Sequence, residues 1–217
     1  MIVIQCELNH NYFSNIDTED KAYFIGLLLA DGSINKRRGE YTIVSLHLAI
    51  QDLDIVEKFK YCTESENTIY IGNKSCAIRL TSRQMVKDLA NYGIVPVKTG
   101  TETPKFGSIP DKLLRHTIRG LIDGDGWYSI SNSNTKIVTS VGICGSYNVC
   151  DYVQNYFSKV LGTGHLKVSK VKDKNCYKIG YSSLNTAIAI VNHLYKDSVI
   201  FIDRKKDNAN NILSLIY

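Results

Sequence analysis

Ile118-Arg119-Gly120-Leu121-Ile122-Asp123-Gly124-Asp125-Gly126 is the second of two related stretches in this sequence, and the first is Phe24-Ile25-Gly26-Leu27-Leu28-Leu29-Ala30-Asp31-Gly32. In each stretch two small residues lie four positions apart, Gly26 with Ala30 and Gly120 with Gly124. Because positions i and i+4 share one face of a helix, the stretches predict two helices whose backbones approach each other closely. Each stretch ends on Asp-Gly, and we expect each glycine to end its helix in a left-handed conformation.

Two helices packed through these small residues would bring Asp31 and Asp125 side by side at their ends. Adjacent carboxylates repel each other, and one of them would be protonated unless a cation lay between them. Mg²⁺ binds to one or two carboxylates together with phosphate oxygens and water. The pair therefore predicts a divalent metal site. Since the helix dipole disfavours a negative charge at a helix C-terminus, a functional role is favoured over a capping role.

The two stretches resemble the paired motifs of LAGLIDADG homing endonucleases, in the single-chain form that carries both motifs. The second stretch departs from the motif at Ile118 and Arg119, and the first has Leu29 in place of the inner aspartate. Both keep the last aspartate and the glycine after it, and in the family this aspartate is the metal-binding catalytic acid. The alternative is a pair of ordinary core helices that end in Asp-Gly turns, but two copies in similar contexts favour the resemblance.

A similar order of elements follows each motif. We expect helices at 18–30, 52–62, 82–92, 111–122, 147–160, 184–195 and 199–215, and strands within 33–50, 68–72, 76–81, 127–131, 136–144, 165–171 and 176–181. Residues 101–110 would link an N-terminal half (1–100) to a C-terminal half (111–217), whose last helix has no counterpart. The resemblance implies an α+β fold of two pseudo-symmetric αββαββα repeats, with the motif helices paired at the interface and a saddle of antiparallel sheets.

The resemblance also implies a basic catalytic residue after the last shared helix of each half. Lys98 matches this place in the first half, and Lys205 matches it in the second, with Arg204 as an alternative. Such a lysine could hold the attacking water or stabilise charge on the phosphate.

Further assignments by resemblance concern water and metal ligands. Gln51, at the end of the long strand, fits a polar residue near the metal-bound water, but Gly145 or Ser146 stands at the matching place in the second half, so this assignment stays open. The backbone carbonyls of Ala30 and Gly124 are plausible additional metal ligands. Mg²⁺ is the expected ion, and Mn²⁺ or Ca²⁺ could occupy the same sites.

Strand side chains that point outward are expected to contact double-stranded DNA, because the major groove admits a two-stranded ribbon. The candidates are Asn35, Arg37, Arg38, Ser45, His47, Arg79, Ser129, Ser131, Asn134, Lys136, Lys167, Lys170, Lys172 and Lys178. The five lysines between positions 167 and 178 are expected mainly to contact phosphates. For each single residue the competing interpretation is a solvated surface position.

Composition adds weaker constraints. The net charge of +5 is concentrated in one half: residues 1–110 have 12 Lys+Arg against 13 Asp+Glu, and residues 111–217 have 14 against 8, which is compatible with a polyanionic partner. The six cysteines form no zinc-type pattern and are better interpreted as reduced thiols than as disulfides. With no long apolar run and no secretory signal, we expect an intracellular, soluble protein.

The resemblance implies a monomeric, Mg²⁺-dependent, site-specific endonuclease that cuts both strands of DNA and serves intron or gene homing. Two alternatives share the fold: an intron RNA maturase and a catalytically silent DNA-binding protein. A third, an α+β protein without a nucleic-acid partner, would be favoured if the basic residues were scattered over both faces of the sheets.

Overall fold

The computed structural model describes residues 7–133 and 136–216. The first half contains α1 (Glu19–Asp31), β1 (Gly32–Arg37), β2 (Glu40–Ala49), a 3₁₀ turn (Ile50–Asp52), α2 (Leu53–Cys62), β3 (Tyr70–Ile71), β4 (Ser75–Thr81) and α3 (Arg83–Ala90). The second half contains α4 (Asp111–Asp125), β5 (Gly126–Ser133), β6 (Lys136–Gly145), α5 (Tyr147–Leu161), β7 (Ser169–Lys170), β8 (Tyr177–Tyr181), α6 (Leu184–Tyr195), α7 (Asp203–Leu213) and a 3₁₀ turn (Ser214–Ile216).

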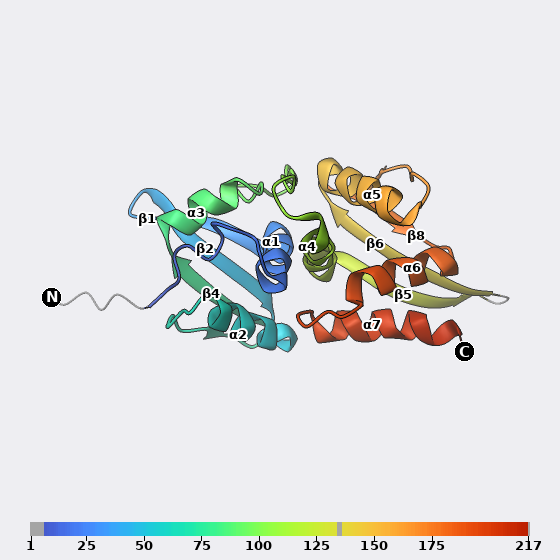
Figure 1. Ribbon diagram of the computed structural model, residues 1–217, viewed down its shortest axis with the longest axis horizontal. Coiled ribbons are helices and arrows are strands. Elements are labelled where there is room, and N and C mark those ends of the chain that lie inside the picture. Colours follow the sequence, from blue (N-terminus) through green and yellow to red (C-terminus); the bar gives the residue numbers. More distant parts are fainter. Residues whose placement is uncertain (1–6, 134–135, 217) are drawn as a thin grey trace.

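The strands form two antiparallel sheets of the same topology, β1-β2-β4-β3 and β5-β6-β8-β7. The helices α1 and α4 lie side by side at the centre, between the two sheets (Figure 1). The predicted α+β architecture with two similar repeats is therefore confirmed. The boundary at 101–110 stays a prediction; this stretch buries two side chains, Phe106 and Ile109, against the core.

Three expected elements are shorter than predicted, and the first is the strand expected at 68–72, which is reduced to β3. The strand expected at 165–171 is reduced to β7, and the last helix begins at Asp203 instead of near Val199. The segment before α7 is held by the other repeat, since the backbone N–H groups of Val199 and Ile200 donate to the Glu19 carboxylate. This extended segment also buries Ile200 and Ile202.

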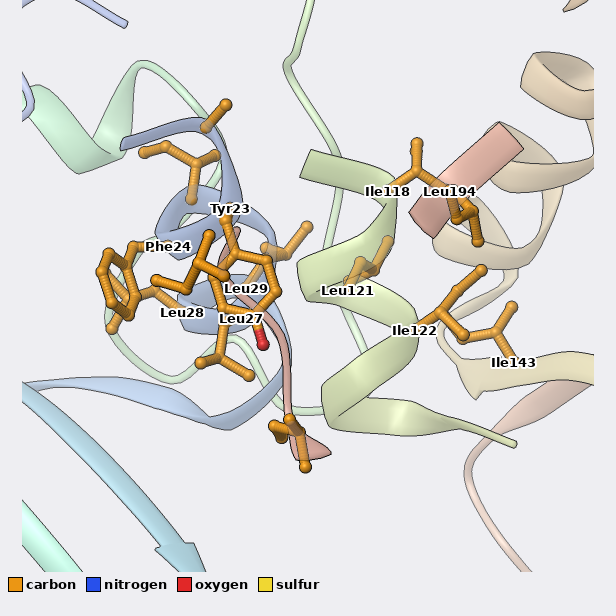
Figure 2. Packing of buried hydrophobic residues seen from close by; sticks show 14 of the residues in the cluster. Tyr23, Phe24, Leu27, Leu28, Leu29, Ile118, Leu121, Ile122, Ile143 and Leu194 are labelled. Carbon is orange, nitrogen blue, oxygen red and sulfur yellow. The ribbon is translucent and has the colours of Figure 1, made fainter. Parts of the chain in front are cut away.

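The motif helices α1 and α4 pack backbone to backbone. A Cβ built on Gly26 would lie 1.9 Å from the carbonyl oxygen of Thr117, and one built on Gly120 would lie 2.1 Å from that of Tyr23. The predicted close approach through the small residues is therefore confirmed. Larger apolar side chains point away from the contact, as Figure 2 shows for Leu28 on one helix and for Ile118 and Ile122 on the other.

The glycines that follow the two motif aspartates were expected to be left-handed, and this expectation is wrong. Gly32 has φ −83° and ψ 158°, and Gly126 has φ −99° and ψ −178°, so both are extended and begin a strand directly. Glycine is required at both positions because a side chain would collide with the preceding turn of the helix. A Cβ on Gly32 would lie 2.5 Å from the carbonyl oxygen of Leu28, and one on Gly126 would lie 2.6 Å from that of Ile122.

Each sheet packs its helices against one face and leaves the other face open. In β2 the alternation follows the prediction: Val44, Leu46 and Leu48 are buried against the helices, and His47 is exposed on the open face. Ser45 also belongs to the open face but is only 5% exposed, because the amide of Asn35 covers it and donates to its hydroxyl at 3.2 Å.

Two minor expectations also bear on the described residues. Five cysteines, Cys62, Cys76, Cys144, Cys150 and Cys176, are free thiols; Cys6 lies outside the described residues. Within the described ranges, every helix is too short or too polar to cross a membrane.

Candidate active site

Asp31 and Asp125 are the last residues of α1 and α4, and the close packing of these helices brings the two aspartates together. The Asp31 carboxylate reaches over the other helix, where its Oδ2 lies 2.7 Å from the position that a Cβ would occupy on Gly124. A side chain larger than hydrogen at this position would displace the carboxylate. The glycine therefore keeps Asp31 next to Asp125.

The environment of the two carboxylates disfavours their charged forms. Burial raises the pKa of Asp31, and the positive charges of Lys98 and Lys205 oppose this shift. For Asp125, desolvation by the surrounding protein and then repulsion by Asp31 raise the pKa to about 6. Because the side chain of Asp125 also reaches solvent, screening moderates the effect. Both shifts favour the protonated carboxyls over the charged ones.

Two buried lysines, each 7% exposed, bind the backbone at the ends of the motif helices. The Nζ of Lys98 donates to the carbonyls of Leu29 at 2.6 Å and Ala30 at 3.1 Å. The Nζ of Lys205 donates to the carbonyl of Gly126. Carbonyls at a helix C-terminus attract cations, which explains why these ammonium groups are held there. Burial lowers the pKa of both lysines.

Arg204, the alternative to Lys205, does not reach the motif helices. Its guanidinium instead forms a forked ion pair with Asp52, with Nε–Oδ1 at 2.8 Å and Nη2–Oδ2 at 2.7 Å. The expected metal ligand Ala30 already accepts a hydrogen bond from Lys98, so one lone pair of its carbonyl is engaged.

The polar residue at the strand end differs between the halves. Gln51 is exposed in the 3₁₀ turn after β2. At the matching place Ser146 caps α5, where its hydroxyl accepts from Val149 N at 3.1 Å and donates to the carbonyl of Glu102. The hydroxyl of Ser146 is therefore engaged in a structural role, while the amide of Gln51 lies on the surface.

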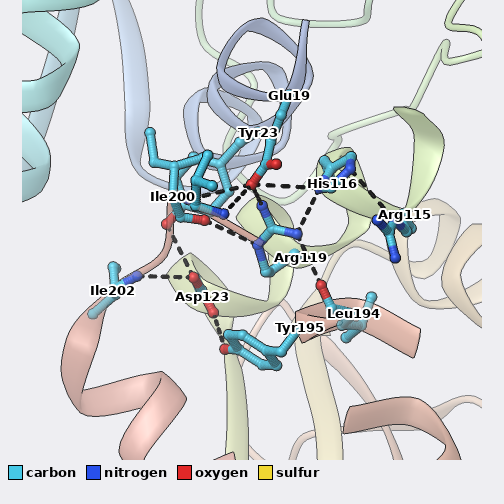
Figure 3. A network of polar contacts seen from close by, with 11 residues as sticks. Glu19, Tyr23, Arg115, His116, Arg119, Asp123, Leu194, Tyr195, Ile200 and Ile202 are labelled. Atoms are coloured by element: carbon cyan, nitrogen blue, oxygen red, sulfur yellow. Dashed lines mark hydrogen bonds and ion pairs between the residues drawn. The ribbon is translucent and has the colours of Figure 1, made fainter. Parts of the chain in front are cut away.

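A buried polar network lies behind the aspartate pair, and sequence reasoning missed its role (Figure 3). Arg119, a departure from the motif, is fully buried and forms an ion pair with Glu19 of the other repeat at 2.7 Å. Its guanidinium also donates to the carbonyls of Ile200 at 3.0 Å and Leu194 at 2.8 Å. A charged residue inside an apolar helical run was the available signal, but its partner lies 100 positions away.

Asp123 forms the second part of this network. Its carboxylate accepts from the hydroxyls of Tyr195 at 2.6 Å and Tyr23 at 3.0 Å and from the backbone N–H of Ile202 at 3.0 Å (Figure 3). Burial raises its pKa, and these hydrogen bonds oppose the shift. The inner aspartate thus holds the chain just before α7, the helix that carries Lys205.

The candidate DNA-contacting residues of the first half line two separate hollows of the surface. Asn35, Ser45, His47 and Arg79 line one hollow on the open face of the sheet, together with Lys36, which sequence reasoning did not select. Arg37 and Arg38 line a different hollow, beside Glu40 and Arg83. The cause is a register shift between Asn35 and Lys36 that reverses the alternation of side chains.

In the second half the candidates Ser129, Ser131, Lys167, Lys170, Lys172 and Lys178 are all exposed. Asn134 lies outside the described residues, and Lys136 is described only as the first residue of β6. Sequence reasoning missed Trp127, which lies on the open face directly after the second motif. Its ring covers Gly142 and Gly180, and its Nε1 donates to Ser140 at 2.9 Å.

The carboxylates of Asp31 and Asp125 are compatible with a hard divalent cation that takes its remaining ligands from water or phosphate. In residues 7–133 and 136–216 no group of three or more His, Cys, Asp or Glu side chains is placed to hold a metal. A closed protein cage is therefore not present in this part of the chain. Two adjacent carboxylates with raised pKa values match the preference of Mg²⁺ for one or two carboxylates plus water and phosphate oxygens.

Comparisons with known proteins place this geometry in context. No family model matches the sequence. An uncharacterized protein of Methanocaldococcus jannaschii is 26% identical over 169 residues, which cover 76% of this chain and 62% of that protein. The match thus spans less than two thirds of the relative's own length.

Solved structures show a closer likeness in fold. They include the LAGLIDADG meganuclease I-AabMI bound to uncleaved DNA (TM-score 0.63, 11% identity, covering 89% of this chain and 88% of that one). They also include the LAGLIDADG homing endonucleases I-SmaMI bound to cleaved DNA (TM-score 0.61, 14% identity, 93% and 89%) and I-GzeII with its DNA target (TM-score 0.61, 14% identity, 90% and 91%). At these identities the likeness establishes that this chain has the two-repeat LAGLIDADG fold.

Proposed function

We propose that this protein is a site-specific endonuclease that hydrolyses a phosphodiester bond in each strand of double-stranded DNA with the aid of a divalent metal ion, Mg²⁺ by preference. The observation that carries the proposal is the meeting of Asp31 and Asp125, one from each repeat, with the buried Lys98 and Lys205 beside them. Phosphodiester hydrolysis needs this combination, because negative charge grows on the phosphate while water attacks it.

The two aspartates would hold the metal through their carboxylates, with water and phosphate oxygens as its other ligands. Bound there, the metal would neutralise charge on the phosphate and lower the pKa of a bound water. Lys98 and Lys205 are held at the helix ends, where their ammonium groups can donate to a phosphate oxygen or to the attacking water. Their lowered pKa values make them better proton donors than a solvated lysine.

The open faces of the two sheets would bind the DNA. Asn35, His47 and Arg79 have the donors and acceptors to read base edges, and the lysines around β7 and β8 would contact phosphates. The DNA-bound I-AabMI, I-SmaMI and I-GzeII structures share the fold, which supports a DNA partner and a single chain that supplies both repeats. Homing of an intron or a gene is the biological role that we infer.

The test is cleavage of a plasmid library of randomised targets by the wild type, Asp125→Asn and Asp111→Asn, with Mg²⁺ or with EDTA. We expect Mg²⁺-dependent double-strand cuts at one recoverable site. Asp125→Asn should lower the rate by at least about 10²-fold, the scale of losing one charge-stabilising group. Asp111→Asn, at the exposed start of the same helix, should cut normally.

Folded wild-type protein that binds DNA but cuts no target would contradict the proposal. It would favour the maturase or the catalytically silent DNA-binding protein, and intron RNA would then be the next ligand to measure.

A further inference from the structure

The two lysines at the helix ends are held by different structures. Lys205 lies in the first turn of α7, where its backbone N–H donates to the carbonyl of Ile202 at 3.0 Å. Lys98 lies in a turn without a helix, closed by a bond from Thr101 N to its own carbonyl at 2.8 Å. The pseudo-symmetry of the fold therefore does not extend to the backbone segments that carry Lys98 and Lys205.

A first support of Lys205 comes from its own repeat. The carboxylate of Asp123 accepts from Ile202 N at 3.0 Å and so fixes the chain immediately before α7. In the first repeat the positions that correspond to Asp123 and Ile202 are occupied by Leu29 and Val95, and Leu29 has no side-chain acceptor for a backbone N–H.

The second support crosses between the repeats. Asp52, only 2% exposed, forms the forked ion pair with Arg204, the neighbour of Lys205. When Lys98 is aligned with Lys205, Arg204 corresponds to Val97, which is 86% exposed. When Gln51 is aligned with Ser146, Asp52 corresponds to Tyr147. An ion pair cannot form between these counterparts.

A forked pair between a guanidinium and a carboxylate fixes both distance and orientation. Here it joins the turn after β2 to the first turn of α7, so it limits how far Lys205 can move relative to the first repeat. Nothing equivalent restrains Lys98 through the counterparts Val97 and Tyr147.

We propose, on the premise of the endonuclease function above, that Arg204 and Asp52 are positioning residues for Lys205 alone. Loss of their ion pair slows the cleavage of one DNA strand and turns a double-strand cutter into a strand-biased nickase.

The experiment uses the full chain and a supercoiled plasmid that carries the recovered target, with a different label on each strand. Lys205→Met first identifies the strand that Lys205 serves. Arg204→Met is then compared with Lys205→Met. The control is Lys21→Met, which removes the ion pair between Lys21 and Asp17 and leaves the pair of Arg204 and Asp52 intact. Because an unpaired buried carboxylate destabilises a fold, Asp52→Asn/Arg204→Met is made as well. All variants are assayed below the unfolding midpoint of the least stable one.

In both Arg204 variants we expect the strand identified by Lys205→Met to be cut roughly tenfold more slowly or worse, since a displacement of about 1 Å can cost up to about 10²-fold. The other strand should keep its rate within about twofold, so that nicked circles accumulate. Equal slowing of both strands, or no slowing in either, would overturn the positioning role while leaving the endonuclease intact. A wild type that cuts neither strand would refute the endonuclease itself and this inference with it.

Discussion

The backbone oxygen of Thr117 lies 1.9 Å from the place that a Cβ would take on Gly26, so the two motif helices touch where no side chain fits. The same holds in the other direction for Gly120 against Tyr23. These contacts fix the separation of the repeats. They therefore also fix the separation of Asp31 and Asp125, which end the two helices.

The first prediction concerns this contact. Gly26→Ala should lower the free energy of unfolding by at least about 3 kcal/mol, because backbone atoms cannot yield as a flexible side chain can. Urea unfolding measures the loss. Gly107→Ala is the control, since nothing lies within 4 Å of its Cβ position, and it should change stability little. Similar stabilities for the two variants would show that the helices can separate freely.

The second prediction concerns the buried pair of Glu19 and Arg119. Arg119→Met should cost about 3–5 kcal/mol, because a carboxylate is then left without its cation in the interior. Glu19→Gln/Arg119→Met should cost less than the two single changes together. A double-mutant cycle from urea unfolding gives the coupling energy, and a value near zero would mean that the pair is not formed in solution.

The third prediction links pH to metal binding. With the pKa of Asp125 raised to about 6, the folded protein retains a proton that the unfolded chain releases near its ordinary pKa of 3.8. The contribution of this group to stability is therefore fully present below that ordinary value, and it is lost as the pH rises through about 6. A divalent cation, which needs the charged carboxylate, should raise the Tm more at neutral pH than at acid pH.

Calorimetry with Mg²⁺ or Ca²⁺ on either side of this pKa measures the difference. Asp125→Asn should abolish the metal-dependent part and raise the Tm of the metal-free protein at neutral pH, because the repulsion by Asp31 is gone. A metal effect that is independent of pH would place the ion elsewhere.

The fourth prediction separates the two kinds of DNA contact. Lys172→Ala should weaken binding to all sequences alike and lower the slope of log affinity against log salt by about 1, as expected for one phosphate contact. Arg79→Ala should cost about 1–3 kcal/mol on the target only and relax its preference at one position. Equilibrium binding to the target and to a scrambled duplex, over a range of salt, measures both. Identical behaviour of the two variants would contradict the assignment of Arg79 to base readout.

The sequence alone was sufficient for the parts that depend on local pattern. Small residues four positions apart predicted the helix contact at Gly26 and Gly120, and the alternation in β2 predicted the burial of Val44 and Leu46. Lys98, by contrast, was expected only from the resemblance to the LAGLIDADG family, and its side chain binds the end of the first motif helix.

Features that depend on distant partners or on small changes of register were not predictable in this way. The single-position shift after Asn35, which turns Arg37 to another face, leaves no trace in composition. Arg119 read as a departure from a motif because its partner Glu19 lies in the other repeat. Gly32 was assigned a left-handed conformation, but crowding by the preceding turn of helix is what excludes a side chain there.

The buried network has a consequence for how the halves recognise each other. It joins Glu19 and Tyr23 of one half to Arg119 and Asp123 of the other, and the corresponding positions of the opposite halves are Leu113, Thr117, Ile25 and Leu29. Two copies of the C-terminal half would each bury a guanidinium against leucine with no carboxylate to receive it. Each half therefore supplies the partner that the buried polar groups of the other half need, and a second copy of the same half would lack it.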